Sequence, residues 1–86
     1  MPQTDLVKAK INAKKIGVSV KPSLLKNKKL DVFFGDKRVA SIGDIRYEDF
    51  LTHGDDKRKA KYLARHQKTR IIKNTPSFYA WKILWT

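Results

Sequence analysis

The stretch LDVFFGDKRVASI, residues 30–42, decides the fold that we predict for this chain. Its two halves, 30–34 and 37–42, are rich in β-branched and aromatic residues, and the pair Gly35-Asp36 separates them. Two such runs around a two-residue turn signal predict a β-hairpin. The turn places Val32 opposite Val39 and Phe33 opposite Arg38. Because an isolated hairpin is scarcely stable in water, we expect one face of it to pack on a helix.

Before the hairpin, apolar side chains at helical spacing predict an amphipathic helix. Thr4 is its expected N-cap and Gly17 its expected C′ glycine. The apolar stripe of this helix consists of Leu6, Ala9, Ala13 and Ile16. Residues 18–29 predict a connector, because Pro22 blocks helix continuation and a charged turn follows it. We therefore expect a basic N-terminal helix or arm with its connector, 1–29, and a core of hairpin and helices, 30–86.

After the hairpin, a possible helical turn at 44–51 leads to a long basic helix from about Lys57 to Lys73. Asp55 and Asp56 place negative charge at the positive end of this helix. Its expected apolar stripe consists of Ala60, Leu63, Ala64 and Ile71, with Gln67 in line. Its other side is a cationic ridge of Arg58, Lys61, Arg65 and Lys68. Like charges at this spacing oppose helix formation, so the ridge invites a functional explanation, with a solvated outer helix as the alternative.

The C-terminal segment is predicted to be a short aromatic helix, with Thr75 as its cap and Pro76 in its first turn. Its aromatic side chains are Phe78, Tyr79, Trp81 and Trp85. Because these rings lie on two sides of the helix, they either complete the core or dock on another protein, and insertion at a membrane surface is a third interpretation.

These elements together predict an α+β fold. We expect a small single domain with an N-terminal helix, one β-hairpin, a long basic helix and a short aromatic C-terminal helix. A chain of 86 residues buries only about 60–65% of the surface that its unfolded form exposes, so we expect marginal stability. The sequence contains no cysteine, which excludes disulfides and thiolate chemistry.

Charge is the strongest functional signal in the sequence. Twenty Lys and Arg residues against 8 Asp and Glu give a formal net charge of +12, which indicates a polyanionic partner. The positive charge gathers in two blocks, 1–29 with a net +7 and 57–73 with a net +8, on either side of a segment with a net −4. We expect it to be concentrated on particular faces, although each block alone is also consistent with an ordinary solvated helix.

The sequence carries no pattern typical of an enzyme. His53 and His66 lack a second ligand at a metal-site spacing, so we expect structural roles, with His66 extending the basic face or contacting an acid. The acids that could gather around Mg²⁺ near His53 are better explained as turn and cap residues; they are Asp44, Glu48, Asp49, Asp55 and Asp56. We predict no catalytic residue, no metal and no cofactor.

Four segments of the chain resemble a family of small basic uncharacterised proteins encoded by large DNA viruses and phages. They are NAKKIGVSVKPS at 12–23, VASIGDIRYEDF at 39–50, DKRKAKYLARHQK at 56–68 and SFYAWKILW at 77–85. The resemblance extends over nearly the whole chain and implies a viral setting. It supplies no mechanism and no site residue.

In that setting we favour a minor virion component, a non-enzymatic structural protein that binds capsid proteins and the packaged genome. Its candidate docking residues are Phe78, Tyr79, Trp81 and Trp85. Its candidate phosphate contacts are Lys8, Lys10, Lys14, Lys15, Arg58, Lys61, Arg65, Lys68 and Arg70. The alternative is a nucleic-acid-binding protein of the infected cell that does not read sequence, since only Gln67 could contribute base contacts from the basic helix.

The location follows from the same features. We expect the protein in the virion or in the host cytoplasm during infection. We expect no signal peptide, and the longest apolar-rich stretch, 78–85, is far shorter than the roughly 20 residues that span a bilayer.

Overall fold

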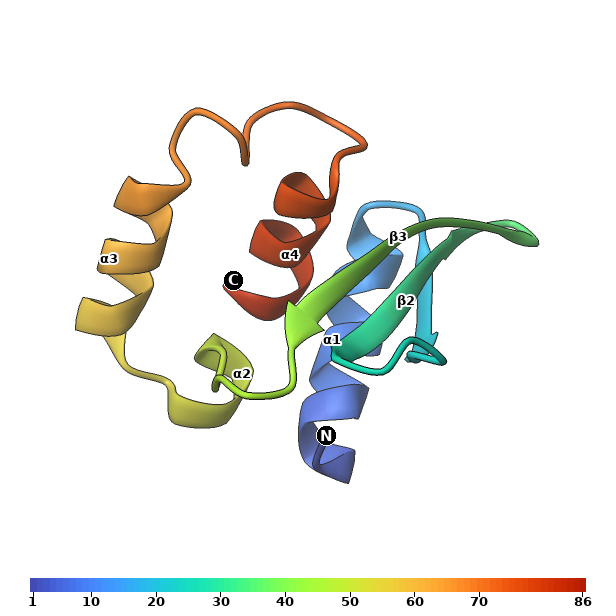
Figure 1. The fold of residues 1–86 in the computed structure, drawn as a ribbon, viewed down its shortest axis with the longest axis horizontal. Helices are drawn as coiled ribbons and strands as arrows, with labels where there is room; N and C mark the ends of the chain where they lie inside the picture. Colours follow the sequence, from blue (N-terminus) through green and yellow to red (C-terminus); the bar gives the residue numbers. More distant parts are fainter.

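A three-stranded antiparallel sheet with two helices across one face forms the centre of the protein (Figure 1). The computed structural model describes residues 1–86. Its elements in chain order are α1 (Gln3–Lys15), β1 (Ser19–Pro22), β2 (Lys28–Phe34), β3 (Lys37–Asp44), α2 (Phe50–His53), α3 (Asp56–Arg65) and α4 (Pro76–Leu84). The predicted α+β fold is therefore confirmed.

The core lies between the sheet and the helices α1 and α4. Alternate residues of β2, Leu30 and Val32, point into it and are fully buried. Helix α1 supplies Ala9 and Ala13, whose small side chains allow close approach, and α4 supplies Ile83 and its neighbours. Because residues before and after position 30 share this core, the chain forms one domain.

The predicted hairpin is present, but its register contains an irregularity. Phe33 pairs with Arg38 as expected, whereas Val32 pairs with Ala40 and not with Val39. The extra residue in β3 brings Leu30 opposite Ile42, so that apolar side chains of both strands face the helices. If Val32 had paired with Val39, the side chains of β3 beyond this point would have pointed to the opposite faces of the sheet, and Ser41 would have entered the core opposite Leu30.

The connector predicted at 18–29 was partly wrong, because residues 19–22 form a third strand. β1 pairs antiparallel with β2, with Val20 opposite Val32. Val20 is buried while its strand neighbours are exposed, which is the half-buried alternation of an edge strand. Pro22 stands at the end of the strand, where the lack of an N–H is tolerated.

Helix α1 differs from the prediction at its start and agrees with it at its end. Pro2 occupies the N-cap position and no side chain caps the helix, so the predicted cap Thr4 was wrong. Gly17 follows the C-cap with φ +77°, as expected of a C′ glycine. The buried carboxylate of Asp5 accepts a hydrogen bond from the Thr52 hydroxyl and so ties α1 to α2.

Helix α3 ends about eight residues earlier than predicted. It stops at Arg65, and residues 66–75 form turns. At this end the Arg70 Nε donates a hydrogen bond to the carbonyl oxygen of Leu63 at 3.2 Å, which satisfies a carbonyl group that a longer helix would have paired within itself.

The packing face of α3 also differs from the predicted stripe. Tyr62 is its buried residue, whereas Ala60 and Ala64 are exposed. Ile71 lies outside the helix and is exposed as well. None of the four helices combines the length and apolar composition that crossing a membrane requires.

We predict that Gly43→Ala destabilises the domain by about 2–4 kcal/mol. Gly43 has φ +77°, and an added Cβ would lie 3.0 Å from Leu84 Cδ1 and 3.1 Å from Lys29 Cβ. The matched control is Gly35→Ala, which has φ +62° but no atom within 4 Å of the new Cβ, so it should cost about 1 kcal/mol. Urea unfolding followed by circular dichroism checks both, and equal losses would show that crowding at Gly43 is unimportant.

Candidate nucleic-acid interface

A cleft of about 570 Å³ opens between α3 and the loop that precedes α2. We call it the α3 cleft. Its lining consists of Tyr47, Glu48, Arg58, Lys61, Tyr62, Arg65, His66 and Trp85. Cationic and aromatic side chains therefore meet on one concave surface, at the edge of the molecule where Figure 1 shows α3.

The floor of the α3 cleft is a pair of stacked rings. The rings of Tyr62 and Trp85 are 4.1 Å apart and nearly parallel, with an angle of 3°. Burial raises the pKa of the Tyr62 phenol, although the charge of Arg65 opposes this. This stack joins the only buried side chain of α3 to the C-terminal segment and so positions the whole helix.

The α3 wall of the cleft carries three cations. Arg58 and Arg65 lie four residues before and three residues after Tyr62, so they share its helix face. Packing Tyr62 on Trp85 therefore turns both guanidinium groups toward the cleft, and Lys61 flanks them. The helix forms here because the Asp55 side chain accepts hydrogen bonds from the backbone N–H groups of residues 57 and 58 at 2.9 and 3.2 Å.

One acid, Glu48, lies in the α3 cleft. Its Oε1 is 3.4 Å from Arg58 Nη1, and both side chains are about half exposed. A solvent-exposed pair of this kind contributes little and is easily exchanged for another anion. Lys61 and Arg65 take part in none of the ion pairs of the chain. The cleft thus retains positive charge that no protein group neutralises.

His66 lines the α3 cleft beside Arg65. Burial, with the positive charge of Arg65, lowers its pKa below the ordinary value of 6.5. Its ring lies 4.5 Å from the Tyr62 ring, as part of the aromatic floor.

The opposite wall of the cleft is an ordered turn that presents Tyr47. The Asp44 carboxylate accepts hydrogen bonds from the Arg46 backbone N–H at 2.9 Å and from Arg46 Nη2 at 2.7 Å. The hydrogen bonds and charge of Arg46 lower the pKa of Asp44 to about 2. The Tyr47 N–H donates to the Asp44 carbonyl oxygen at 3.1 Å, while Tyr47 itself is 67% exposed.

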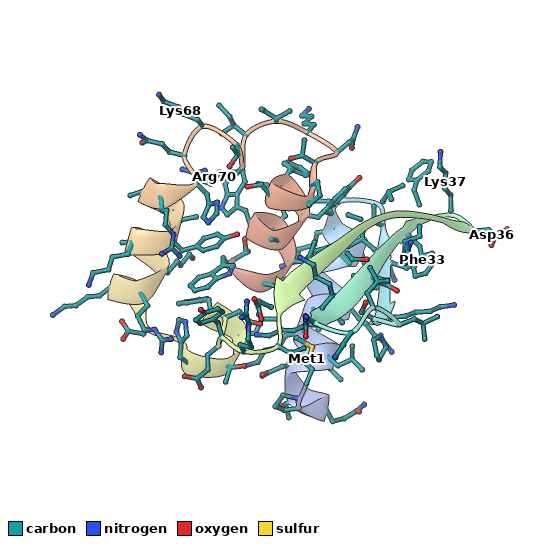
Figure 2. All side chains as sticks on the ribbon, viewed as in Figure 1. Met1, Phe33, Asp36, Lys37, Lys68 and Arg70 are labelled. Carbon is teal, nitrogen blue, oxygen red and sulfur yellow. The ribbon has the colours of Figure 1, made fainter.

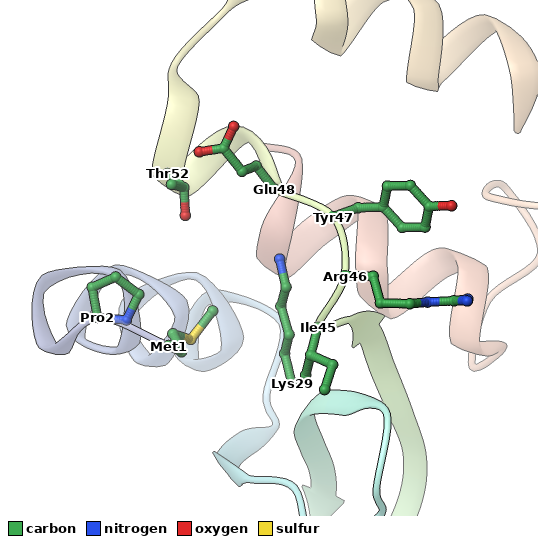
Figure 3. A pocket seen from close by; sticks show the side chains of 8 residues that line it. All are labelled: Met1, Pro2, Lys29, Ile45, Arg46, Tyr47, Glu48 and Thr52. Atoms are coloured by element: carbon green, nitrogen blue, oxygen red, sulfur yellow. The ribbon is translucent and has the colours of Figure 1, made fainter.

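A second, smaller cavity of about 270 Å³ lies between the start of the chain, Met1 and Pro2, and the same loop before α2 (Figure 3). Lys29 reaches into it, but its Nζ is 2.8 Å from the buried carboxylate of Asp49. Figure 3 shows Arg46 and Tyr47 directed away from Met1 and Pro2. The Lys29 ammonium group is therefore already paired, in contrast to Lys61 and Arg65 of the α3 cleft.

The remaining predicted phosphate contacts lie elsewhere. Lys68 is exposed on the turn after α3, whereas Arg70 turns inward (Figure 2). The Arg70 guanidinium lies 4.5 Å from the centre of the Trp81 ring, so this residue has a structural role. The four N-terminal lysines, Lys8, Lys10, Lys14 and Lys15, are exposed on α1. Figure 1 shows α4 between α1 and α3, so the two basic blocks form separate surfaces.

The four predicted docking residues are used largely within the domain. Tyr79 is only 4% exposed, so the prediction that it contacts a partner does not fit this fold. Its hydroxyl donates to Asn74 Oδ1 at 3.2 Å. Phe78 is half-buried against the core, and the cationic ends of Arg70 and Lys82 lie 4.5 and 4.1 Å from the centre of the Trp81 ring. The C-terminal rings thus complete the core and the cleft.

The acidic residues act at turns and helix starts, as expected. Asp49 caps α2 by accepting a hydrogen bond from the Leu51 N–H at 3.0 Å, and Asp55 caps α3. His53 Nδ1 accepts a hydrogen bond from the Asp55 N–H at 2.9 Å. No three His, Asp or Glu side chains gather where they could hold a metal ion.

Sequence reasoning missed two aromatic residues of the cleft, Tyr62 and Tyr47, and Tyr47 is the exposed one. It stands in a polar turn between Arg46 and Glu48, where an aromatic side chain has no partner of its own along the chain. That isolation was the available signal, but only the folded chain shows that this turn lies opposite α3.

Comparison with known proteins gives one match. A family model described as Family of unknown function (DUF5754) matches residues 18–66, which include all three strands, α2 and α3. Tyr47 and the three cations of α3 lie within the matched residues. No curated protein and no solved structure matches the chain.

Proposed function

The chain belongs to the family of unknown function DUF5754, and we propose that it is a non-enzymatic domain that binds the phosphate backbone of nucleic acids in the α3 cleft. The observation that carries this proposal is the convergence of Arg58, Lys61 and Arg65 on one concave surface with a single acid. A net charge of +12 would draw a polyanion to the molecule, and the cleft would then hold it.

The proposed binding does not depend on base sequence. Arg and Lys contacts to phosphate position a nucleic acid, whereas sequence is read by hydrogen bonds to base edges. The cleft lining contains no Asn or Gln, and Gln67 lies outside it. Insertion of α3 into a major groove is less well supported, because the face that carries Arg58 and Arg65 also packs Tyr62 on Trp85.

A role in a virus particle is the second proposal. Exposed apolar side chains support a protein partner, among them Leu24, which is 94% exposed, and Phe34 at the hairpin end. These residues would take the docking role that the sequence suggested for the C-terminal rings. Recovery of the protein from purified particles after washing at high salt is the expected result, and its absence from particles would reject this role.

We predict that replacing Arg58, Lys61 and Arg65 together by Gln weakens binding to a random-sequence oligonucleotide by at least about tenfold at about 50 mM salt. The control replaces Lys26, Lys37 and Lys73 by Gln, which removes the same charge from exposed sites outside the cleft. Fluorescence anisotropy measures both, and circular dichroism verifies that α3 is retained.

The control distinguishes a binding site from general charge attraction. If the cleft binds the backbone, the control variant should stay within about threefold of the unmodified protein, since distant exposed charges are screened at this salt concentration. Equal losses in the two triple variants would contradict the proposal, and so would the absence of oligonucleotide binding by the unmodified protein.

A further inference from the structure

We propose that the α3 cleft binds single-stranded nucleic acid in preference to duplex, with one base stacked on the ring of Tyr47. This inference rests on the proposed function and adds the form of nucleic acid that the cleft selects. It is carried by an exposed aromatic residue, Tyr47, that lines the same cleft as three cations.

Tyr47 takes no part in the core. The residue is 67% exposed, and its ring is not paired with any other aromatic ring of the protein. The Arg46 guanidinium lies 5.6 Å from its centre and also holds Asp44. Since leaving a large ring in water forgoes the gain from burying it, the exposed ring indicates a ligand with an apolar face.

The backbone around Tyr47 is ordered before any ligand arrives. The Arg46 N–H donates to the Asp44 side chain and the Tyr47 N–H donates to the Asp44 carbonyl oxygen. The neighbouring Asp49 is buried and caps α2. Because this turn is already fixed, Tyr47 loses little conformational freedom on binding, and stacking on its ring carries a small entropic cost.

The opposite wall fits a short piece of one strand. Arg58 and Arg65 are seven residues apart on α3, which corresponds to about 10 Å along the helix axis. A base on Tyr47 would keep its own phosphate near the α3 cations, because both walls belong to one cleft.

A duplex cannot use both walls. Its bases are paired and stacked inside the helix, so it can offer phosphates to α3 but no free base face to Tyr47 without unpairing. A single strand offers both, and base–aromatic stacking tolerates every base. An acidic polypeptide could satisfy the cations, but its side chains would gain nothing from the ring. Tyr47 therefore distinguishes a single strand from both a duplex and an acidic polypeptide.

The test compares three polyanions of matched length with four forms of the protein. The probes are a single-stranded oligonucleotide of about 12 nucleotides, the corresponding duplex and polyglutamate, each at about 50 mM salt. The proteins are the unmodified chain, Tyr47→Ala, Tyr47→Phe and the control Phe34→Ala. Phe34 is 68% exposed at the hairpin end, so its removal matches that of Tyr47 in exposed aromatic area.

We expect the unmodified protein to bind the single strand at least about fivefold more tightly than the duplex. Tyr47→Ala should weaken single-strand binding by about 5- to 100-fold, as loss of one stacked base implies, and should leave duplex binding within about twofold. Tyr47→Phe keeps the ring and should bind as the unmodified protein does. Phe34→Ala should change neither affinity.

The outcomes separate this inference from the function on which it rests. Equal binding of single strand and duplex, unchanged in Tyr47→Ala, would overturn the stacking inference and leave backbone binding intact. Equal losses in Phe34→Ala and Tyr47→Ala would overturn it as well. Polyglutamate bound as tightly as the single strand would overturn both proposals in favour of an acidic polypeptide, and binding to no probe would reject the proposed function itself.

Discussion

Replacing Tyr62 by alanine is expected to release α3 from the rest of the protein while the sheet stays folded. Tyr62 is the only buried residue of α3, and its stack on Trp85 at 4.1 Å is the main side-chain contact between this helix and the C-terminal segment. Losing a buried aromatic side chain costs about 3–5 kcal/mol. Ten residues of α3 alone are too few to stay helical in water.

Hydrogen exchange followed by mass spectrometry measures this separation. In Tyr62→Ala, amides of α3 should lose their protection, whereas those of β2, whose Leu30 and Val32 are fully buried, should keep most of theirs. Tyr62→Phe retains the ring and serves as the control. Unchanged protection of α3 in Tyr62→Ala would show that the ring stack does not hold the helix, and the α3 cleft would then need another explanation.

Replacing Asp31 by alanine is expected to lower the free energy of unfolding by about 3 kcal/mol near neutral pH. Asp31 is 3% exposed and accepts hydrogen bonds from the hydroxyls of Ser23 and Ser41 at 2.6 and 2.7 Å. It also accepts one from the Leu24 N–H at 3.2 Å. The substitution leaves these donors without an acceptor and frees the β1–β2 connection. Urea unfolding gives the loss directly, and a loss below about 1 kcal/mol would contradict this role.

The same carboxylate predicts how stability depends on pH. Burial alone would raise the pKa of Asp31, but the hydrogen bonds of Ser23, Ser41 and the Leu24 N–H, together with the charge of Arg38, outweigh burial and lower it. A lowered pKa in the folded state adds stability above the ordinary carboxyl pKa of about 3.9, and this stability is lost as the pH falls through the folded value.

The isosteric variant Asp31→Asn isolates that contribution. Its deficit in unfolding free energy relative to the unmodified protein should be largest near neutral pH and should shrink as the pH is lowered below about 4. Unfolding curves at about pH 7 and about pH 3 test this, and an equal deficit at the two pH values would contradict the role of the charge.

The features predicted correctly from the sequence were those fixed by neighbouring residues. Gly35-Asp36 connects the two predicted strands, Thr75 caps α4 through the Phe78 N–H at 3.3 Å, and Asp55 caps α3. In each case the signal and its structural effect lie within a few residues. Helical spacing grouped Arg58, Lys61 and Arg65, but it placed them opposite the packing face, whereas Arg58 and Arg65 share the face of the buried Tyr62.

The features that were missed depend on contacts between distant residues. β1 is a strand because Val20 pairs with Val32 and is covered by α1, not because four residues with a proline favour a strand. The end of α3 depends on Arg70 folding back onto Leu63. The cleft itself required Trp85 to meet Tyr62 from 23 residues away, which no local pattern indicates.

The proposal that the α3 cleft binds the nucleic-acid backbone is tested most directly by the salt dependence of single-strand binding. Each phosphate neutralised on a single strand contributes about 0.7 to the slope of log K against log salt. The Gln variant of Arg58, Lys61 and Arg65 should therefore have a slope about 2 units shallower than the unmodified protein. The matched variant of Lys26, Lys37 and Lys73 should have the unmodified slope. A slope that is flat in the unmodified protein, or reduced equally in the two variants, would contradict binding at the cleft.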